Sequence, residues 1–273
     1  MVRGGQGLCA ALLALAALAL TSGRPFADDA DRAKPLFGEA WRLAGAGNHR
    51  AAVEKYQAGI ALLPDSSAAR YHLAKSLEAV GRDGEAILEY CRAARLAPDT
   101  EEGKQAIAHL RLPVDAGIGN GRTNFSDKSS YAGEMLNGKV HGCGTQNYAD
   151  GSILRSVFRG GKIHGRGAVI YANGDRYVGD WNSGDMTGRG VYVNENGNSY
   201  DGEMRRGLRH GQGTLKWGFN RYIGAWKDDR PDGYGEIFFA VENAWFKGQW
   251  TNGCFRDANG RPFGIGRPHS ECP

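Results

Sequence analysis

The apolar positions of this chain follow one period in its first half and a different period in its second half. From Ala33 to about Leu112, apolar residues recur at the 3.6-residue spacing of amphipathic helices. Shifting this segment by 34 residues superposes it on itself, which predicts a repeat built of two helices. The matched pairs are Ala40 with Ala74, Leu43 with Leu77, Gly47 with Gly81, Ala52 with Ala86, Tyr56 with Tyr90 and Pro64 with Pro98.

The residues that recur explain how such helices would pack. Small residues let two antiparallel helices approach closely, glycine allows the turn between them, and proline ends the second helix. The pattern resembles the tetratricopeptide repeat, although Glu39 stands in the first copy where that family usually has leucine. Two copies are present, and "EEGKQAIAHLRL" after them resembles the capping helix that such arrays need.

From Tyr131 a longer repeat replaces the helical one. The unit "YVGDWNSGDMTGRG" recurs as "YAGEMLNGKVHGCG", "YDGEMRRGLRHGQG" and "YIGAWKDDRPDGYG". Because side chains alternate along a strand, Tyr177, Gly179 and Trp181 should share one face, where the glycine leaves room for a ring from a neighbouring strand. Turn sequences such as "NSGD" and "YANGD" predict a β-hairpin in each unit. Six units are predicted, opening at Tyr131, Leu154, Tyr177, Tyr200, Tyr222 and Phe246.

These units resemble the MORN repeat (membrane occupation and recognition nexus) over residues 131–257. The second unit departs from the family pattern, because it has Leu154, Ser156 and Phe158 in place of Tyr, Gly and Trp. The fifth has Asp229 in place of the turn glycine, and the sixth drifts after its first turn and is interpreted as an end cap. The expected fold class is α+β in separate domains: a short tetratricopeptide-like array of helical hairpins, then an antiparallel β-meander of MORN hairpins.

The expected domain organisation is a helical domain at 33–112, a linker at 113–130, the hairpin domain at 131–257 and a tail at 258–273. Before them, residues 1–23 contain one arginine, an apolar run and small residues, the pattern of a signal peptide cleaved after residue 23 or as late as 27. The apolar run from Leu8 to Leu20 is short for a membrane span, which favours cleavage over an uncleaved anchor. We therefore expect a periplasmic or secreted protein.

Export would change the chemistry of the cysteines, because disulfides form in oxidising compartments. Cys91, Cys143, Cys254 and Cys272 follow the predicted signal peptide and could pair in three ways. The favoured pair is Cys254 with Cys272, since the tail between them has little else to hold it in place. Cys91 lies within a predicted helix and is interpreted as a core residue.

Charge and motifs narrow the possible functions. The formal net charge of +4 is scattered along the chain, whereas nucleic-acid binding requires clustered basic residues, so no nucleic-acid partner is expected. The glycine-rich "GIGNGRT" lacks the glycine spacing and the strand-to-helix context of a phosphate loop, and it is assigned to the linker. No arrangement of catalytic residues stands out. We therefore expect no enzyme activity and no cofactor.

Three histidines at equivalent positions raise the question of a metal site. His141, His164 and His210 each precede a Gly-x-Gly segment. Equivalent positions of successive hairpins lie two strands, or about 10 Å, apart. Zinc ligands lie only about 2 Å from the ion, so this column cannot share one metal, and no metal site is expected.

The resemblance to tetratricopeptide arrays implies a binding surface. Such arrays commonly hold an extended peptide on the concave face formed by the first helix of each repeat, so a protein or peptide partner is expected. The alternative is that the chain's own linker or sheet covers this face. The positions carried over are Lys34, Phe37, Trp41, Tyr71, Lys75 and Glu78, with Gln105 and His109 on the capping helix.

Aromatic residues of the predicted sheet either pack against the next repeat or form a stacking platform for sugars or peptides. The glycines between them favour packing. The leading hypothesis is a non-enzymatic, exported interaction scaffold whose helical half holds a protein partner and whose sheet docks a second surface. The alternative, which the family's name suggests, is that the sheet binds membrane lipid headgroups or an envelope glycan. The aromatics concerned are Tyr177, Trp181, Tyr200, Tyr222, Trp226 and Trp250.

Overall fold

The computed structural model describes residues 26–113, 115–266, 268 and 271–272, so the predicted signal peptide lies outside the described residues. Two compact units divide the chain. The first unit holds the residues up to 82 and residues 92–104, and the second holds 83–91 and everything from 105 onward. The second unit thus includes residues that the sequence analysis assigned to the helical domain. Within the described part of the chain, no helix combines the length and the apolar character needed to cross a membrane.

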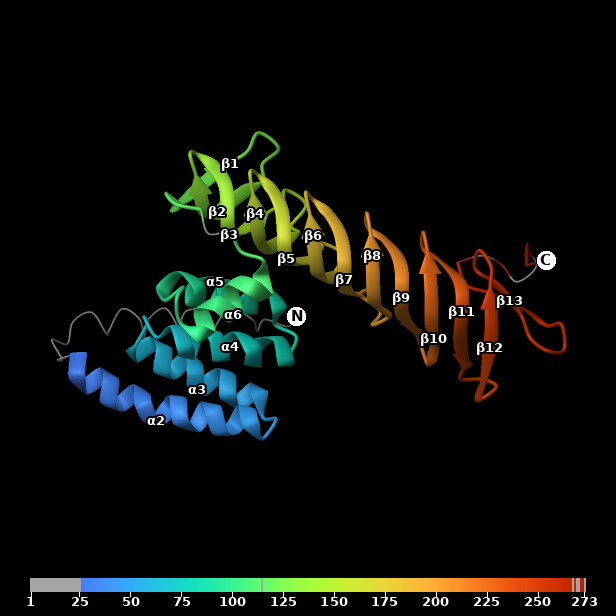
Figure 1. Ribbon diagram of the computed structural model, residues 1–273, viewed down its shortest axis with the longest axis horizontal. Helices are drawn as coiled ribbons and strands as arrows, with labels where there is room; N and C mark the ends of the chain where they lie inside the picture. The colour runs from blue at the N-terminus through green and yellow to red at the C-terminus, as the bar shows by residue number, and fades with distance from the viewer. Residues whose placement is uncertain (1–25, 114, 267, 269–270, 273) are drawn as a thin grey trace, which may run out of the picture. The chain divides into compact units, whose positions relative to one another are not determined.

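Glycines shape the turns of the helical part. Gly47 and Gly81 have left-handed φ angles of 78° and 75°. In each turn the next residue donates a 2.9 Å backbone hydrogen bond to a leucine carbonyl, from Asn48 to Leu43 and from Arg82 to Leu77. The same turn geometry therefore recurs where the sequence repeats. The helices are α2 (Phe26–Gly45), α3 (His49–Leu62), α4 (Ser67–Ala79), α5 (Asp83–Leu96) and α6 (Glu101–Leu110) (Figure 1).

Small residues bring the helices of the first unit close together. Ala40, Ala52 and Ala74 expose no surface to solvent. The ring of Phe37 on α2 covers Gly59 on α3, so that a methyl group at residue 59 would clash with it. The small residues that the repeat pattern singled out therefore lie in helix–helix contacts.

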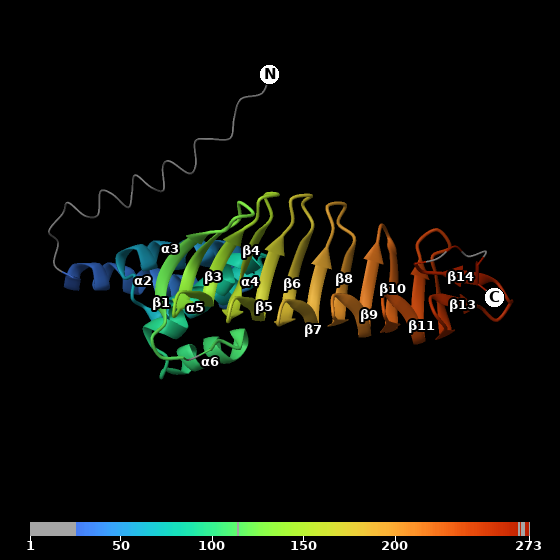
Figure 2. The same cartoon turned by 90° about the horizontal axis from the view of Figure 1, so that it is seen from above.

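Twelve strands form one antiparallel sheet in chain order, and each pairs only with its neighbours in the sequence (Figures 1 and 2). This meander after a helical part confirms the expected fold class. The strands are β1 (Gly119–Asn124), β2 (Ser130–Leu136), β3 (Lys139–Asn147), β4 (Ile153–Arg159), β5 (Lys162–Ile170), β6 (Arg176–Asn182), β7 (Asp185–Val193), β8 (Ser199–Arg205), β9 (Leu208–Trp217), β10 (Asn220–Lys227), β11 (Arg230–Phe239) and β12 (Ala244–Trp250). A separate two-stranded sheet consists of β13 (Cys254–Arg256) and β14 (Pro262–Gly264).

Both ends of the sheet differ from the sequence prediction. Strand β1 lies in the region assigned to the linker and pairs with β2 from Gly119 opposite Met135 to Asn124 opposite Ser130. Its sequence "GNGRTN" lacks the aromatic-x-Gly motif, and backbone pairing with β2 holds it in the sheet. At the other end β12 extends the sheet, but the rest of the sixth unit leaves to form β13 with β14. The sheet therefore has five complete hairpins flanked by two strands, and the expectation of six hairpins was wrong.

A row of glycines, interrupted once by Ser156, crosses the whole sheet, with each member directly opposite the next. Tyrosine rings fill the space above it: the ring of Tyr177 covers Gly179 and Gly190, where an added methyl group would clash with it. Tyr131, Tyr200 and Tyr222 cover the glycines of their own hairpins in the same way. The sequence therefore repeats glycine because the rings need the room. The row is Gly121, Gly133, Gly144, Ser156, Gly167, Gly179, Gly190, Gly202, Gly213, Gly224, Gly235 and Gly248.

The first glycine of each Gly-x-Gly segment has a different role, which is to form a β-bulge. The φ angles of Gly142, Gly188 and Gly211 are 57°, 59° and 57°, and the strand register shifts beside each of them. An acidic side chain from the preceding strand accepts the backbone N–H that follows the bulge. Glu203 accepts from Gln212 at 2.9 Å, for example. These bulges explain why the motif pairs an acidic residue with a glycine eight residues later.

Aromatic rings also connect one hairpin to the next. Trp226 of the fifth hairpin lies edge-on to Tyr200 of the fourth, with 5.4 Å between the ring centroids. Trp250 on β12 contacts Tyr222 of the fifth hairpin at 5.1 Å. Edge-to-face pairs at this distance stabilise a core beyond the area that they bury. The apolar core of the sheet therefore continues from repeat to repeat.

Candidate binding surfaces

An open groove runs along the face of the sheet that carries the glycine row. It consists of two clefts of about 830 and 360 Å³, which share Asp150, Ser152, Tyr171 and Met186 in their linings and are therefore continuous. We call these two clefts together the inner groove. Side chains such as Met204 and Leu215 give it an apolar floor, and the volume of the larger cleft lies within the range of ligand sites in proteins, roughly 300–1,000 Å³.

Equivalent turns place a series of residues at one end of the strands, and four of these residues line the inner groove. The backbone N–H of Tyr148 donates to the carbonyl of Ser152, and that of Tyr171 to the carbonyl of Asp175, both at 2.9 Å. The same bond, from the first to the fifth residue of the turn, occurs in the turns before and after these two. We call the first residues of these turns, with the equivalent tryptophan of the next repeat, the turn ladder. It comprises Phe125, Tyr148, Tyr171, Asn194 and Trp217, spaced 23 residues apart.

A tyrosine–carboxylate pair lies in the larger cleft. The Tyr192 hydroxyl donates a short hydrogen bond to Oδ2 of Asp175, and the backbone N–H of Glu195 donates to Oδ1 at 3.0 Å. These bonds, first that from Tyr192, lower the pKa of the Asp175 carboxyl and keep it ionised. The same hydrogen bond, followed by burial, raises the pKa of Tyr192 to about 12. The pair therefore holds a fixed negative charge in the groove.

The larger cleft is also lined by three other charged residues, Arg209, Asp229 and Asp150. Arg209 pairs with Asp229, with 3.1 Å from Nε to Oδ1, and its guanidinium lies 4.3 Å from the ring centre of Trp226. Asp150 accepts the backbone N–H of Ser152 at 2.8 Å. Among the described residues, no lysine or arginine forms an ion pair with Asp150 or with the Asp175 carboxylate. The groove lining therefore carries a net negative charge.

The six sheet aromatics named from the sequence lie beneath this surface rather than on it. Tyr177, Tyr200 and Tyr222 are at most 2% exposed, and Trp181, Trp226 and Trp250 at most 7%. Burial is the main cause that raises the pKa of each of these tyrosines. They form the core, and the aromatics that line the groove, Tyr148, Tyr171, Tyr192 and Trp217, are half-buried against it. Sequence reasoning missed the ladder. The first residues of "YADGS" and "YANGD" are Tyr148 and Tyr171, so the recurrence of tyrosine at this turn position could have indicated it.

In the helical unit, aromatic side chains gather around a histidine. The ring of His72 lies 4.6 Å from that of Trp41 and 5.3 Å from that of Tyr71. Lys75 Nζ lies 5.8 Å from the Tyr71 ring centre. Burial and then the charge of Lys75 lower the pKa of His72 and favour its neutral form. Trp41 is 61% exposed, so this face presents a large apolar side chain to solvent.

The other residues of the predicted helical surface are more dispersed. Lys34 pairs with Asp31 at 3.1 Å on the exposed side of α2, and Phe37 is engaged with Gly59. Glu78 lies near the C-terminal end of α4. Gln105 and His109 belong to the second unit, where the ring of His109 lies 4.6 Å from that of Tyr90. Within the first unit, the structure thus brings together Trp41, Tyr71 and Lys75.

The opposite face of the sheet carries an apolar and basic patch near its C-terminal end. Lys216, Arg221, Phe238 and Trp245 lie directly opposite one another on four successive strands. Phe219, in the turn between β9 and β10, is 90% exposed, and Val241, in the turn between β11 and β12, is 96% exposed. Equivalent turns of earlier repeats have Asp-Gly or Asn-Gly at their tips. We call these six residues the outer patch.

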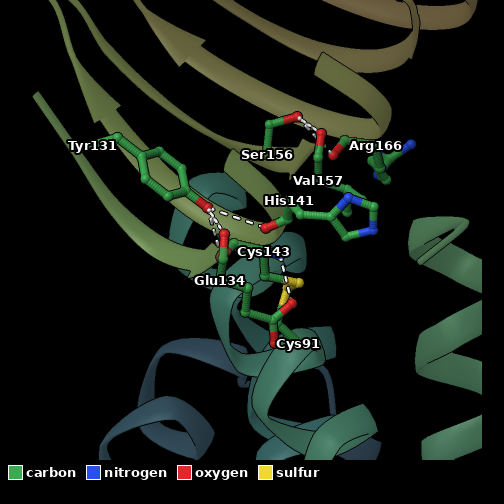
Figure 3. Close-up of a disulfide and its surroundings, with 8 residues drawn as sticks. All are labelled: Cys91, Tyr131, Glu134, His141, Cys143, Ser156, Val157 and Arg166. Atoms are coloured by element: carbon green, nitrogen blue, oxygen red, sulfur yellow. Dashed lines mark hydrogen bonds between the residues drawn. A yellow bond between two sulfur atoms is a disulfide. The ribbon is translucent and has the colours of Figure 1, made fainter. Parts of the chain in front are cut away.

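Two disulfides stabilise the second unit. One joins Cys254 to Cys272, the pair that the sequence analysis favoured. The other joins Cys91 on α5 to Cys143 on β3. Cys91 is buried, as the sequence analysis expected, and is also bonded, which the sequence analysis did not foresee. Figure 3 shows this second bond beside Glu134, whose Oε2 accepts the backbone N–H of Cys143 at 2.8 Å. The sequence could not reveal it, because neither spacing nor motif relates α5 to β3.

The three histidines occupy separate environments. His141 is buried and its Nε2 lies 2.8 Å from Asp115 Oδ2, while the backbone N–H of Gly160 donates to its Nδ1 at 3.4 Å. His210 Nδ1 lies 3.7 Å from Asp228 Oδ1. Burial, then Arg159 and Arg111, lowers the pKa of His164. No group of three histidine, cysteine or acidic side chains able to hold a metal ion occurs among the described residues.

The geometry of these repeats agrees with a comparison to known families. The family model of the MORN repeat matches residues 131–153, 157–176, 177–199, 200–218 and 222–241. The predicted sixth unit, from Phe246, lies outside the matched segments. A search of the curated proteins finds no match. The C-terminal part of the chain, within residues 131–241, therefore contains five MORN repeats.

Proposed function

We propose that this chain is a non-enzymatic, exported scaffold that binds polypeptide partners through two units, a tetratricopeptide-like helical unit and a sheet of MORN repeats. In this proposal the sheet holds its partner in the inner groove. The observation that carries the proposal is the groove itself, an open cleft of about 830 Å³ with an apolar floor and an aromatic rim. Apolar grooves with a few polar groups are typical of sites that bind extended segments.

The helical unit would supply a second contact with a protein partner. Trp41 is 61% exposed beside His72, and exposed aromatic side chains of this size are enriched at the centres of protein interfaces. Tyr71 and Lys75 extend the same face. This arrangement supports a docking surface around His72.

Affinity capture with groove variants tests the proposed role of the sheet. The full chain and its variants Tyr171→Ala and Trp217→Ala would serve as baits for envelope extracts, with quantitative mass spectrometry of the captured proteins. The matched control is Tyr234→Ala, because Tyr234 is an exposed tyrosine on the opposite face of the same sheet. We expect at least one protein that the groove variants lose and the control retains. Identical captured sets for all four baits would contradict the proposal.

Export is supported by the two disulfides, because such bonds persist in oxidising compartments and are rare in the cytosol. Cell fractionation combined with alkylation of free thiols tests this point. We expect the mature protein in the periplasm or the medium, with all four cysteines protected from alkylation. A full-length cytoplasmic protein with reactive thiols would contradict export.

The outer patch favours a second candidate function, the binding of anionic lipid headgroups by the sheet. Phe219 and Val241 stand at exposed turn tips, beside the positive charges of Lys216 and Arg221. Apolar side chains with adjacent basic residues are typical of proteins that lie on anionic membranes. Co-sedimentation with phosphatidylglycerol vesicles, compared with phosphatidylcholine vesicles, tests this function. We expect salt-sensitive binding that Phe219→Asp abolishes, and equal results for both vesicles would contradict it.

A further inference from the structure

Negative charge and aromatic rings occupy the same part of the inner groove. Asp150 and Asp175 both line the larger cleft, where Tyr171 and Tyr192 also lie. Arg209 is the one basic residue of that lining, and it is already paired with Asp229. A ligand with negative charge would be repelled from this surface, whereas a cation could contact both a carboxylate and an aromatic face.

The carboxylates and rings are close enough to affect one another. Burial raises the pKa of the Tyr148 hydroxyl, and the negative charges of Asp150 and then Asp127 raise it further. Burial also raises the pKa of Tyr171, followed by the effects of Tyr148 and Asp175. Carboxylate charge therefore reaches two successive rings of the turn ladder, Tyr148 and Tyr171.

The spacing of the turn ladder constrains the shape of a ligand. Equivalent residues of successive hairpins lie two strands apart, or about 9.6 Å at 4.8 Å per strand. Three residues of a polyproline II segment span about 9.3 Å, and they complete one turn of that helix. Every third side chain of such a segment would thus face an equivalent position of the groove.

We propose that the inner groove selects an extended, cationic polypeptide whose lysine or arginine side chains, three residues apart, lie between the rings of Tyr148 and Tyr171 and the carboxylates of Asp150 and Asp175. This inference rests on the proposed function, because it names the chemistry of the partner that the same groove holds. Lysine and arginine fit the site because their aliphatic stems contact the apolar floor while their charged ends reach the acidic rim.

Three matched peptides test the proposal against the full chain. Each contains four repeats of Pro-Leu-Lys, Pro-Leu-Gln or Pro-Leu-Glu, so that only the charge at every third residue differs. Affinities would be measured by fluorescence anisotropy with a labelled peptide. We expect the lysine peptide to bind at least about tenfold more tightly than the glutamine peptide, since it places several cations near the carboxylates. The preference should fall with added salt, because the screening length shrinks from about 10 Å at 0.1 M to about 3 Å at 1 M.

Variants of the full chain test whether the lysine peptide contacts the carboxylates of Asp150 and Asp175. Asp150→Asn keeps an oxygen that accepts the backbone N–H of Ser152, and Asp175→Asn keeps one for the backbone N–H of Glu195, while its amide group can donate to the Tyr192 hydroxyl. Each variant should weaken the lysine peptide by about two- to fivefold. Asp201→Asn is the control, because Asp201 is exposed on the opposite face, between Val191 and Thr214. The glutamine peptide should bind all these variants equally.

The possible outcomes separate this inference from the proposed function. Equal binding of all three peptides, or tightest binding of the glutamate peptide, would overturn the cationic partner and leave a polypeptide-binding groove. Failure of every peptide, or binding only of a neutral β-linked oligosaccharide, would overturn both. Equal losses in Asp150→Asn and Asp201→Asn would place the cationic contact outside the groove and overturn the inference alone.

Discussion

The indole Nε1 of Trp181 donates a hydrogen bond to the carbonyl oxygen of Gly167, 3.3 Å away on the preceding hairpin. Trp226 makes the equivalent bond to Gly213, also at 3.3 Å. In both cases the residue that accepts is a member of the glycine row, so its carbonyl is reachable because no side chain covers it. The tryptophan of one MORN repeat is therefore held by the glycine of the repeat before it.

Removal of this ring should destabilise the sheet strongly. Trp181 is 7% exposed and contacts Tyr177 with 5.4 Å between ring centroids. We expect Trp181→Ala to lower the free energy of unfolding by about 3 to 5 kcal/mol, the range for a buried large aromatic residue. Chemical denaturation of the full chain, followed by far-UV circular dichroism, measures the change. Trp245→Ala is the control, because Trp245 is 44% exposed on the opposite face, and a similar loss there would contradict the argument.

The glycine row should not tolerate a side chain. A methyl group on Gly179 would clash with the Tyr177 hydroxyl and would come within 2.7 Å of Gly190 Cα. Because backbone atoms cannot move aside easily, we expect Gly179→Val to cost about 1 to 3 kcal/mol or more. Gly119→Val on β1 is the matched control, since no atom lies within 4 Å of a Cβ added there. Thermal melts that showed equal losses for both variants would contradict this account of the row.

The repeated hairpins could be predicted because the sequence of each one contains its own strand alternation and turn residues. Alternation in "YVGDW" placed Tyr177 and Trp181 on one face, and both are buried there. Sequence reasoning failed where a structure depends on a partner elsewhere in the chain. Strand β1 pairs along the edge of β2, and the second disulfide joins Cys91 to Cys143, 52 residues away in the sequence.

The candidate site was less accessible to sequence reasoning than the fold. The aromatic-x-Gly motif marks the residues that build the core, so the most regular aromatics are buried. Groove residues such as Tyr171 and Trp217 lie in the second turn of each unit, where the sequence varies and Asn194 interrupts the series. A 23-residue spacing was present, but only the register of the sheet shows that these positions share a rim.

The bond between Tyr192 and Asp175 should be visible in the titration of the carboxyl group. Folding lowers the pKa of Asp175 below its ordinary value of 3.8, mainly through the Tyr192 hydroxyl. Its contribution to stability is therefore present above the unfolded pKa and is lost as the pH falls through the lowered value. We expect Tyr192→Phe to raise the pKa of Asp175 and to reduce this loss in acid. Carboxyl carbon shifts in NMR titrations measure it, with Tyr234→Phe as the control that should leave the pKa unchanged.

The two disulfides should contribute unequally to stability, because they close loops of different length. Cys91 and Cys143 are 52 residues apart, whereas Cys254 and Cys272 are 18 apart. Chain entropy predicts about 4 kcal/mol for the longer loop and about 3 kcal/mol for the shorter. We expect replacement of both members of the first pair by alanine to lower the denaturation midpoint more than the same change in the second pair. Reductant should destabilise the parent protein and leave a variant that lacks all four cysteines unchanged. A parent protein that resists reductant, with four thiols open to alkylation, would show that neither bond forms.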